Sequence, residues 1–93
     1  MNIKIPSYSP RELEVIANAD RVVARVFLNG QWKEQEFFPD PGQTVRERLE
    51  VTQHALRHHR DFSQICLYLG AEINGERATA AVPHDYIPLE LKR

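Results

Sequence analysis

Three side chains in the middle of the chain have a spacing that suits a metal ion. Glu50, His54 and His58 lie four residues apart, which places them one above another on one face of a helix. Two histidines at this spacing are workable zinc ligands, and Cys66 or His84 could supply a third. However, the sequence has no Cys-x-x-Cys pair, and no glutamate adjoins His54 as a metalloprotease motif requires. We therefore expect a solvated polar helix face without a metal ion, and the sequence implies no cofactor.

Cys66 is the only cysteine, and together with a histidine it could form a nucleophile and base pair. It lies in the apolar run Ile65-Cys66-Leu67, where a cysteine is usually buried and inert. The four glycines form no phosphate-binding loop, and no Ser-His-Asp arrangement or carboxylate pair has a recognisable spacing. The sequence therefore predicts that the protein is not an enzyme, with no catalytic residue and no evident small-molecule substrate. A single cysteine cannot form an internal disulfide, so a reducing cytoplasm is the simplest location.

The segment 57–60 (Arg-His-His-Arg) is basic and could contact phosphate, although acidic residues are interspersed around it. Cations at this place also complement the negative end of a helix. The net charge of −1, without a concentrated basic face, argues against binding to nucleic acid or to a membrane surface. A small metal- or nucleic-acid-binding protein that uses His54, His58 and Arg57–Arg60 is therefore only the third of our hypotheses.

The most informative side chains, Phe27 and Trp32, flank an Asn29-Gly30 turn. Asn-Gly supplies the two positive φ angles of a type I′ hairpin turn. This turn sets Phe27 opposite Trp32 and Arg25 opposite Glu34, so that an aromatic pair and an ion pair share one face. The other face carries an aliphatic row, which is the better core face: Val22, Ala24, Val26 and Leu28.

If the aliphatic row packs on the core, Phe27 and Trp32 lie outside. Exposed paired aromatic rings are a solubility liability unless a partner covers them, and tryptophan is enriched at interface hot spots. The alternative is that the two rings lie under the N-terminal arm or belong to the core themselves. The predicted partner-binding residues are Phe27, Trp32, Arg25 and Glu34.

Two capping boxes predict the helices that flank this hairpin. Residues 1–8 are expected to form an irregular arm, and Ser9-Pro10-Arg11-Glu12 then predicts a short helix over 10–18, with a strand as the alternative. Thr44-Val45-Arg46-Glu47 predicts a longer helix that ends near His59. Its expected core stripe consists of Val45, Leu49, Thr52, Leu56 and His59, and Gln53 is expected to lie away from it.

A second hairpin follows, with strands over 65–73 and 76–82 around Asn74-Gly75, and the tail after Pro83 is expected to run extended as an edge segment. The fold class is thus α+β: a mostly antiparallel sheet of two Asn-Gly hairpins packed on one long helix, in a single domain over 1–93. A capping box followed by an Asn-Gly hairpin occurs twice, over residues 9–40 and 44–85, which common motifs can also produce by chance; if these two halves are repeats, the element order is α-β-β-α-β-β. The residues expected to be almost fully buried together are Val26, Leu49, Leu56, Leu67 and Leu69.

Several elements follow one another in a recognisable order over residues 20–93. They are the hairpin at Asn29-Gly30, Asp40-Pro41-Gly42 before a helix, a strand over 65–69, a last hairpin, and a tail from Val82-Pro83 to Leu89-Glu90-Leu91-Lys92-Arg93. This layout resembles small phage-encoded anti-CRISPR proteins directed at type I CRISPR-Cas systems. The Ser9-Pro10 capping box departs from that pattern, in which a strand would stand there. The resemblance carries over no site residue and implies only a role.

That role is our first hypothesis: a non-catalytic module, encoded by a phage or another mobile element, that binds a host protein complex stoichiometrically in the bacterial cytoplasm and inhibits it. A second hypothesis is a structural or regulatory subunit of a bacterial assembly, a homodimer through an open sheet edge. No apolar run is long enough to span a bilayer, and the first residues lack the apolar core of a signal peptide.

Overall fold

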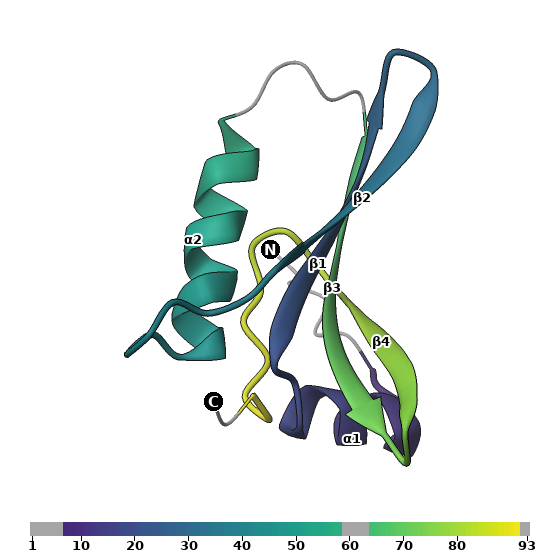
Figure 1. Cartoon of the computed structure of the whole chain (residues 1–93), viewed down its shortest axis with the longest axis vertical. Coiled ribbons are helices and arrows are strands. Elements are labelled where there is room, and N and C mark those ends of the chain that lie inside the picture. The colour runs from purple at the N-terminus through teal and green to yellow at the C-terminus, as the bar shows by residue number, and fades with distance from the viewer. Residues whose placement is uncertain (1–6, 59–63, 92–93) are drawn as a thin grey trace.

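The computed structural model describes residues 7–58 and 64–91. The element order is α1 (Pro10–Ala17), β1 (Arg21–Leu28), β2 (Gln31–Phe37), α2 (Val45–Arg57), β3 (Gln64–Ile73) and β4 (Glu76–Val82). The strands form one antiparallel sheet in the order β2-β1-β3-β4 (Figure 1). The predicted α+β class with a mainly antiparallel sheet is therefore confirmed. Within the described residues, neither helix is both long and apolar enough to cross a membrane.

Both helices begin at capping boxes. The Ser9 side chain accepts a hydrogen bond from the Glu12 amide (3.2 Å), and the Glu12 carboxylate accepts one from the Ser9 amide (3.0 Å). Thr44 and Glu47 repeat this exchange at 3.0 Å in each direction, and the hydrogen bonds from the backbone and side chain of Thr44 lower the pKa of Glu47. Residues 10–17 are therefore helical, and the alternative strand is wrong.

The two strand pairs are joined by residues with positive φ. The φ angles are 53° at Asn29, 79° at Gly30, 54° at Asn74 and 81° at Gly75, in the left-handed region that such two-residue turns require. Across β1 and β2, Phe27 pairs with Trp32 and Arg25 with Glu34, which is the register that the turn implies. β1 also pairs with β3, so that the two hairpins share one sheet.

The core lies between one face of the sheet and both helices. Val15 and Ile16 of α1 and Leu49 of α2 are buried in the same cluster as alternate residues of β1, β3 and β4. Of the predicted core residues, Leu49, Leu67 and Leu69 are at most 2% exposed. Leu56 and Val26 are only half-buried, so the prediction was wrong for these two. The reason is that α2 lies against β1 and leaves a gap towards β2.

The tail after Pro83 corrects two further predictions. Residues 83–91 form turns rather than an edge strand, and Pro88 and Leu91 are buried against the core. Gln53 is buried, not turned away, because its amide Nε2 donates to the carbonyl oxygens of Pro83 (3.2 Å) and Tyr86 (2.9 Å). One side-chain amide thus fixes the tail along α2. The sequence gives no sign that the side chain of a polar helix residue forms hydrogen bonds with a distant segment of the chain.

Each helix packs on strands of the other half of the chain. α1 lies against β3 and β4, whereas α2 lies against β1. The observed order is the α-β-β-α-β-β expected if the halves are repeats. Residues 7 and 8 have no regular structure, and the Tyr8 hydroxyl donates to the carbonyl oxygen of Ala81 in β4 (3.2 Å). Burial is the main cause of the raised pKa of Tyr8.

Candidate functional site

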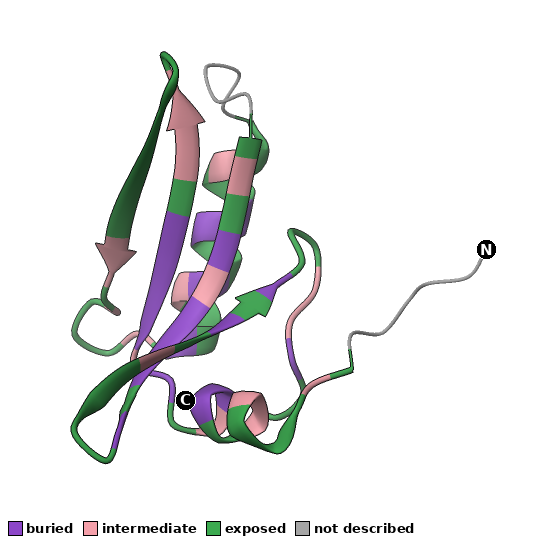
Figure 2. Cartoon of the chain, turned by 90° about the vertical axis from the view of Figure 1, so that its right-hand side faces the viewer, coloured by how far each residue is buried: buried purple, intermediate pink, exposed green. Residues whose placement is uncertain are grey.

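The face of the sheet opposite the helices is uncovered over much of its area (Figure 2). Strand alternation sends every second side chain to it, and these side chains carry most of the aromatic and charged groups of the sheet. Both described helices pack on the other face, so neither of them covers this surface. Its members are Arg21, Val23, Arg25, Phe27, Trp32, Glu34, Glu36, Cys66, Tyr68, Glu72, Arg77, Thr79 and Ala81.

The four predicted partner-binding residues lie together in the half of the β1–β2 hairpin that is nearer its turn. The ring centroids of Phe27 and Trp32 are 5.2 Å apart with an interplanar angle of 59°. The Arg25 guanidinium lies 5.5 Å from the Trp32 ring centroid and 3.9 Å from the Glu34 carboxylate. Trp32 is 44% exposed and Phe27 is half-buried. We call these four residues the aromatic cluster.

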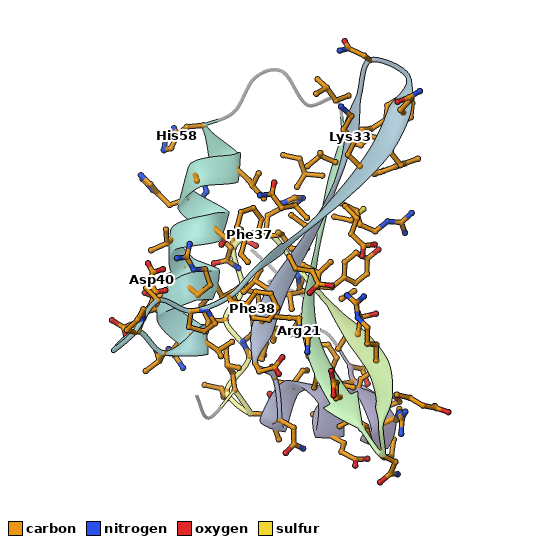
Figure 3. The ribbon with its side chains drawn as sticks, viewed as in Figure 1. Arg21, Lys33, Phe37, Phe38, Asp40 and His58 are labelled. Atoms are coloured by element: carbon orange, nitrogen blue, oxygen red, sulfur yellow. The ribbon has the colours of Figure 1, made fainter. Side chains whose placement is uncertain are left out.

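The other end of the same face holds a cluster that the sequence did not predict. The Arg21 side chain is only 9% exposed and lies 2.7 Å from a carboxylate oxygen of Asp20, 3.3 Å from Glu36 and 3.6 Å from Glu72. The Phe38 ring covers its guanidinium at 5.2 Å (Figure 3). The hydrogen bond to Asp20 is the main cause of the raised pKa of Arg21. Arg77 of β4 also pairs with Glu36, so the cluster ties β2, β1, β3 and β4 together.

Gly70 of β3 makes room for the flat Arg21 side chain. A Cβ atom at this position would lie 2.9 Å from Cγ of Arg21 and 3.2 Å from its Cδ. We expect Gly70→Ala to lower the free energy of unfolding by about 1–3 kcal/mol, as overpacking usually does. Urea denaturation measures this loss, and Ala81→Gly on the exposed part of β4 is the control for a glycine exchange in a strand. An unchanged stability of Gly70→Ala would show that Arg21 moves aside freely.

The structure separates the groups that were considered as metal ligands. His54 and His58 are exposed on α2 with ring centroids 4.7 Å apart, and Glu50 pairs with Arg46 at 3.6 Å. Cys66 and His84 line a shallow hollow of about 430 Å³ beside β4 instead. Among the residues that the structure describes, no group of three or more His, Cys, Asp or Glu side chains suits a metal ion.

We expect purified protein to contain far less than one zinc ion per chain, because two histidines alone leave a tetrahedral site incomplete. Elemental analysis of protein dialysed without chelator tests this. About one zinc ion per chain, lost in His54→Ala, would contradict the expectation and support a metal-binding role.

Cys66 is exposed, so the expectation that it is buried was wrong. It stands opposite Arg25 in the β1–β3 register and so points to the uncovered face, whereas Ile65 and Leu67 point to the core. The apolar neighbours suggested that Cys66 is buried, but successive residues of a strand point to opposite faces, so buried neighbours place Cys66 on the exposed face.

Half of the basic segment 57–60 lies outside the described residues. No family model, no curated protein and no solved structure matches this chain.

Proposed function

We propose that the protein is a non-catalytic protein-binding module whose contact surface is the aromatic cluster. The observation that carries the proposal is the exposure of Trp32, which is 44% exposed beside the Phe27 ring on a sheet face without a helix. Tryptophan and arginine are the residue types most enriched among interface hot spots. A partner that covers this surface would remove exposed apolar area from water.

The arrangement of the aromatic cluster also favours binding. Trp32 is held by the Phe27 ring on one side and the Arg25 guanidinium on another, so little side-chain freedom remains to be lost on association. Arg25 and Glu34 are about half exposed and form a charged rim beside the rings. A partner surface with a shallow apolar depression and polar edges fits this pattern.

The partner class that we propose is a bacterial host complex such as a type I CRISPR-Cas effector, inhibited by stoichiometric binding. The support is the resemblance in the order of elements to anti-CRISPR proteins encoded by phages. Purified chain is mixed with an assembled type I effector and passed over a size-exclusion column. Co-elution of the wild-type chain, with loss of target-DNA binding by the effector, is the expected result.

The control variant for this experiment is Leu89→Ser, which changes another exposed apolar side chain, 83% exposed and distant in sequence. It should co-elute as the wild type does, and Trp32→Ala should not. Failure of the wild-type chain to bind any assembled type I effector would contradict this partner class while leaving the aromatic cluster open to another protein.

A homodimer is the second candidate, and the outer edge of β4 favours it. β4 is an edge strand, and its residues from Ala78 to Val82 have small or uncharged side chains that do not obstruct the pairing of another strand. β2, at the other edge, carries Lys33, Glu34 and Glu36. Sedimentation velocity should show a dimer that Thr79→Pro abolishes, whereas a monomer at all concentrations would exclude this candidate.

A further inference from the structure

A groove of about 500 Å³ opens between α2 and the β1–β2 hairpin, on the sheet face opposite the aromatic cluster. Its floor and helix wall are apolar, and the strand β2 contributes a polar wall of Lys33 and Gln35. Glu34 also borders the groove, but its side chain points to the other sheet face, where it pairs with Arg25. The apolar lining residues are Ala24, Val26, Leu28, Phe37 and Leu56.

The β3–β4 hairpin carries smaller side chains than the β1–β2 hairpin at the equivalent place, where α1 lies against it. Counted from their turns, Ala78 and Ala80 of β4 occupy the positions that Lys33 and Gln35 occupy in β2. The two alanines let α1 lie directly on β3 and β4. On β2 the long polar side chains of Lys33 and Gln35 line the groove instead, and Val26 is half-buried. The groove is therefore built into the sequence of β2.

The charge of the groove comes from Lys33. Its side chain is the only charged one that the strand pattern directs into the groove, and it forms no ion pair with the described residues. Most arginines of the described chain, in contrast, have carboxylate partners. Lys33 stands at the same end of the molecule as His58, which ends α2 (Figure 3). An apolar floor beside an unpaired ammonium group is complementary to an anion with an aliphatic body.

The groove is the size of a small-molecule site, with a volume of about 500 Å³. This volume lies within the range of about 300–1,000 Å³ that is common for small-molecule sites. We propose that the groove binds an anionic amphiphile, with its chain against Val26, Leu28 and Leu56 and its head group on Lys33.

The proposal is independent of the protein-binding function, because it uses the opposite face of the sheet. The test uses decanoate as the anionic probe and decyltrimethylammonium as a cationic probe with the same chain length, both below their micelle concentrations. Methyl resonances of Val26, Leu28 and Leu56 are followed by NMR during each titration. Decanoate should shift them saturably, and the cation should bind at least about tenfold more weakly.

Variants at Lys33 separate charge recognition from adsorption. Because Lys33 is exposed and has no ion pair with the described residues, Lys33→Gln and Lys33→Glu should fold normally. We expect decanoate affinity to fall about threefold to fivefold in Lys33→Gln and at least about tenfold in Lys33→Glu, as for a solvent-accessible charge pair. Arg11→Gln removes another exposed cation, on α1, and should leave the affinity unchanged. Equal binding of both probes, shifts that do not saturate, or unchanged affinity in Lys33→Glu would overturn the proposal.

Discussion

Replacing Leu49 with alanine is expected to lower the free energy of unfolding by about 2–5 kcal/mol, the usual range for a fully buried leucine. Leu49 is 0% exposed and lies where α2 meets the sheet, with Val22 and Leu69 in the same cluster. The loss combines the transfer free energy of the missing methyl groups with the cavity that rigid neighbours leave behind. Chemical denaturation with an unchanged m value measures it.

Leu56→Ala is the matched variant, because it makes the same chemical change two turns further along the same helix. Leu56 is half-buried and lines the groove, so water already reaches part of the volume that the change would empty. The free energy of unfolding of Leu56→Ala should therefore fall by about 1 kcal/mol, which is below the range for fully buried leucines. Equal losses in the two variants would mean that the groove is closed in solution.

Arg21→Met is expected to lower the free energy of unfolding by about 2–4 kcal/mol. Methionine keeps an unbranched apolar stem over Gly70 but removes the charge on which Asp20, Glu36 and Glu72 converge. Breaking a buried ion pair costs about 3–5 kcal/mol, and the range here is lower because Glu72 and Asp20 are partly exposed. Thermal unfolding at low and at high salt measures the loss.

Arg25→Met is the control for this change, made in the same strand and on the same face. The Arg25–Glu34 pair is about half exposed, and its closest atoms are 3.9 Å apart. Arg25→Met should therefore lower the free energy of unfolding by no more than about 1 kcal/mol. If Arg21→Met is no more destabilising than Arg25→Met, the buried arginine does not hold the strands together.

The elements were predictable because their signals are local. A capping box needs four consecutive residues, and both boxes start helices where Ser9 and Thr44 predicted them. Similarly, a two-residue turn sets its own register, which is why Phe27 faces Trp32 in the structure. The aliphatic row of β1 also predicted which face would meet the helices, since Val22 and Ala24 belong to the same core cluster as residues of α1 and α2.

The wrong predictions concern how the elements pack against one another. Leu56 and Val26 were expected in the core because they have the right period, but the period does not show that a groove lies between α2 and β2 beside them. Gln53 was wrongly predicted to lie away from the core stripe, because the carbonyl groups to which it donates belong to the tail, about 30 residues later. The Arg21 cluster likewise depends on contacts between all four strands. Non-local packing of this kind is not encoded in any short window of residues.

The role of the aromatic cluster is tested most directly by the affinity of Trp32→Ala for the assembled type I effector, compared with the thermal midpoint of the variant. Trp32 is an exposed residue of an edge strand, so its removal should leave the midpoint within about 2 °C of the wild type. The dissociation constant should rise at least about tenfold, as for a hot-spot side chain, while Leu89→Ser should bind like the wild type. An unchanged dissociation constant, or unfolding of Trp32→Ala, would contradict the assignment of this sheet face as the binding surface.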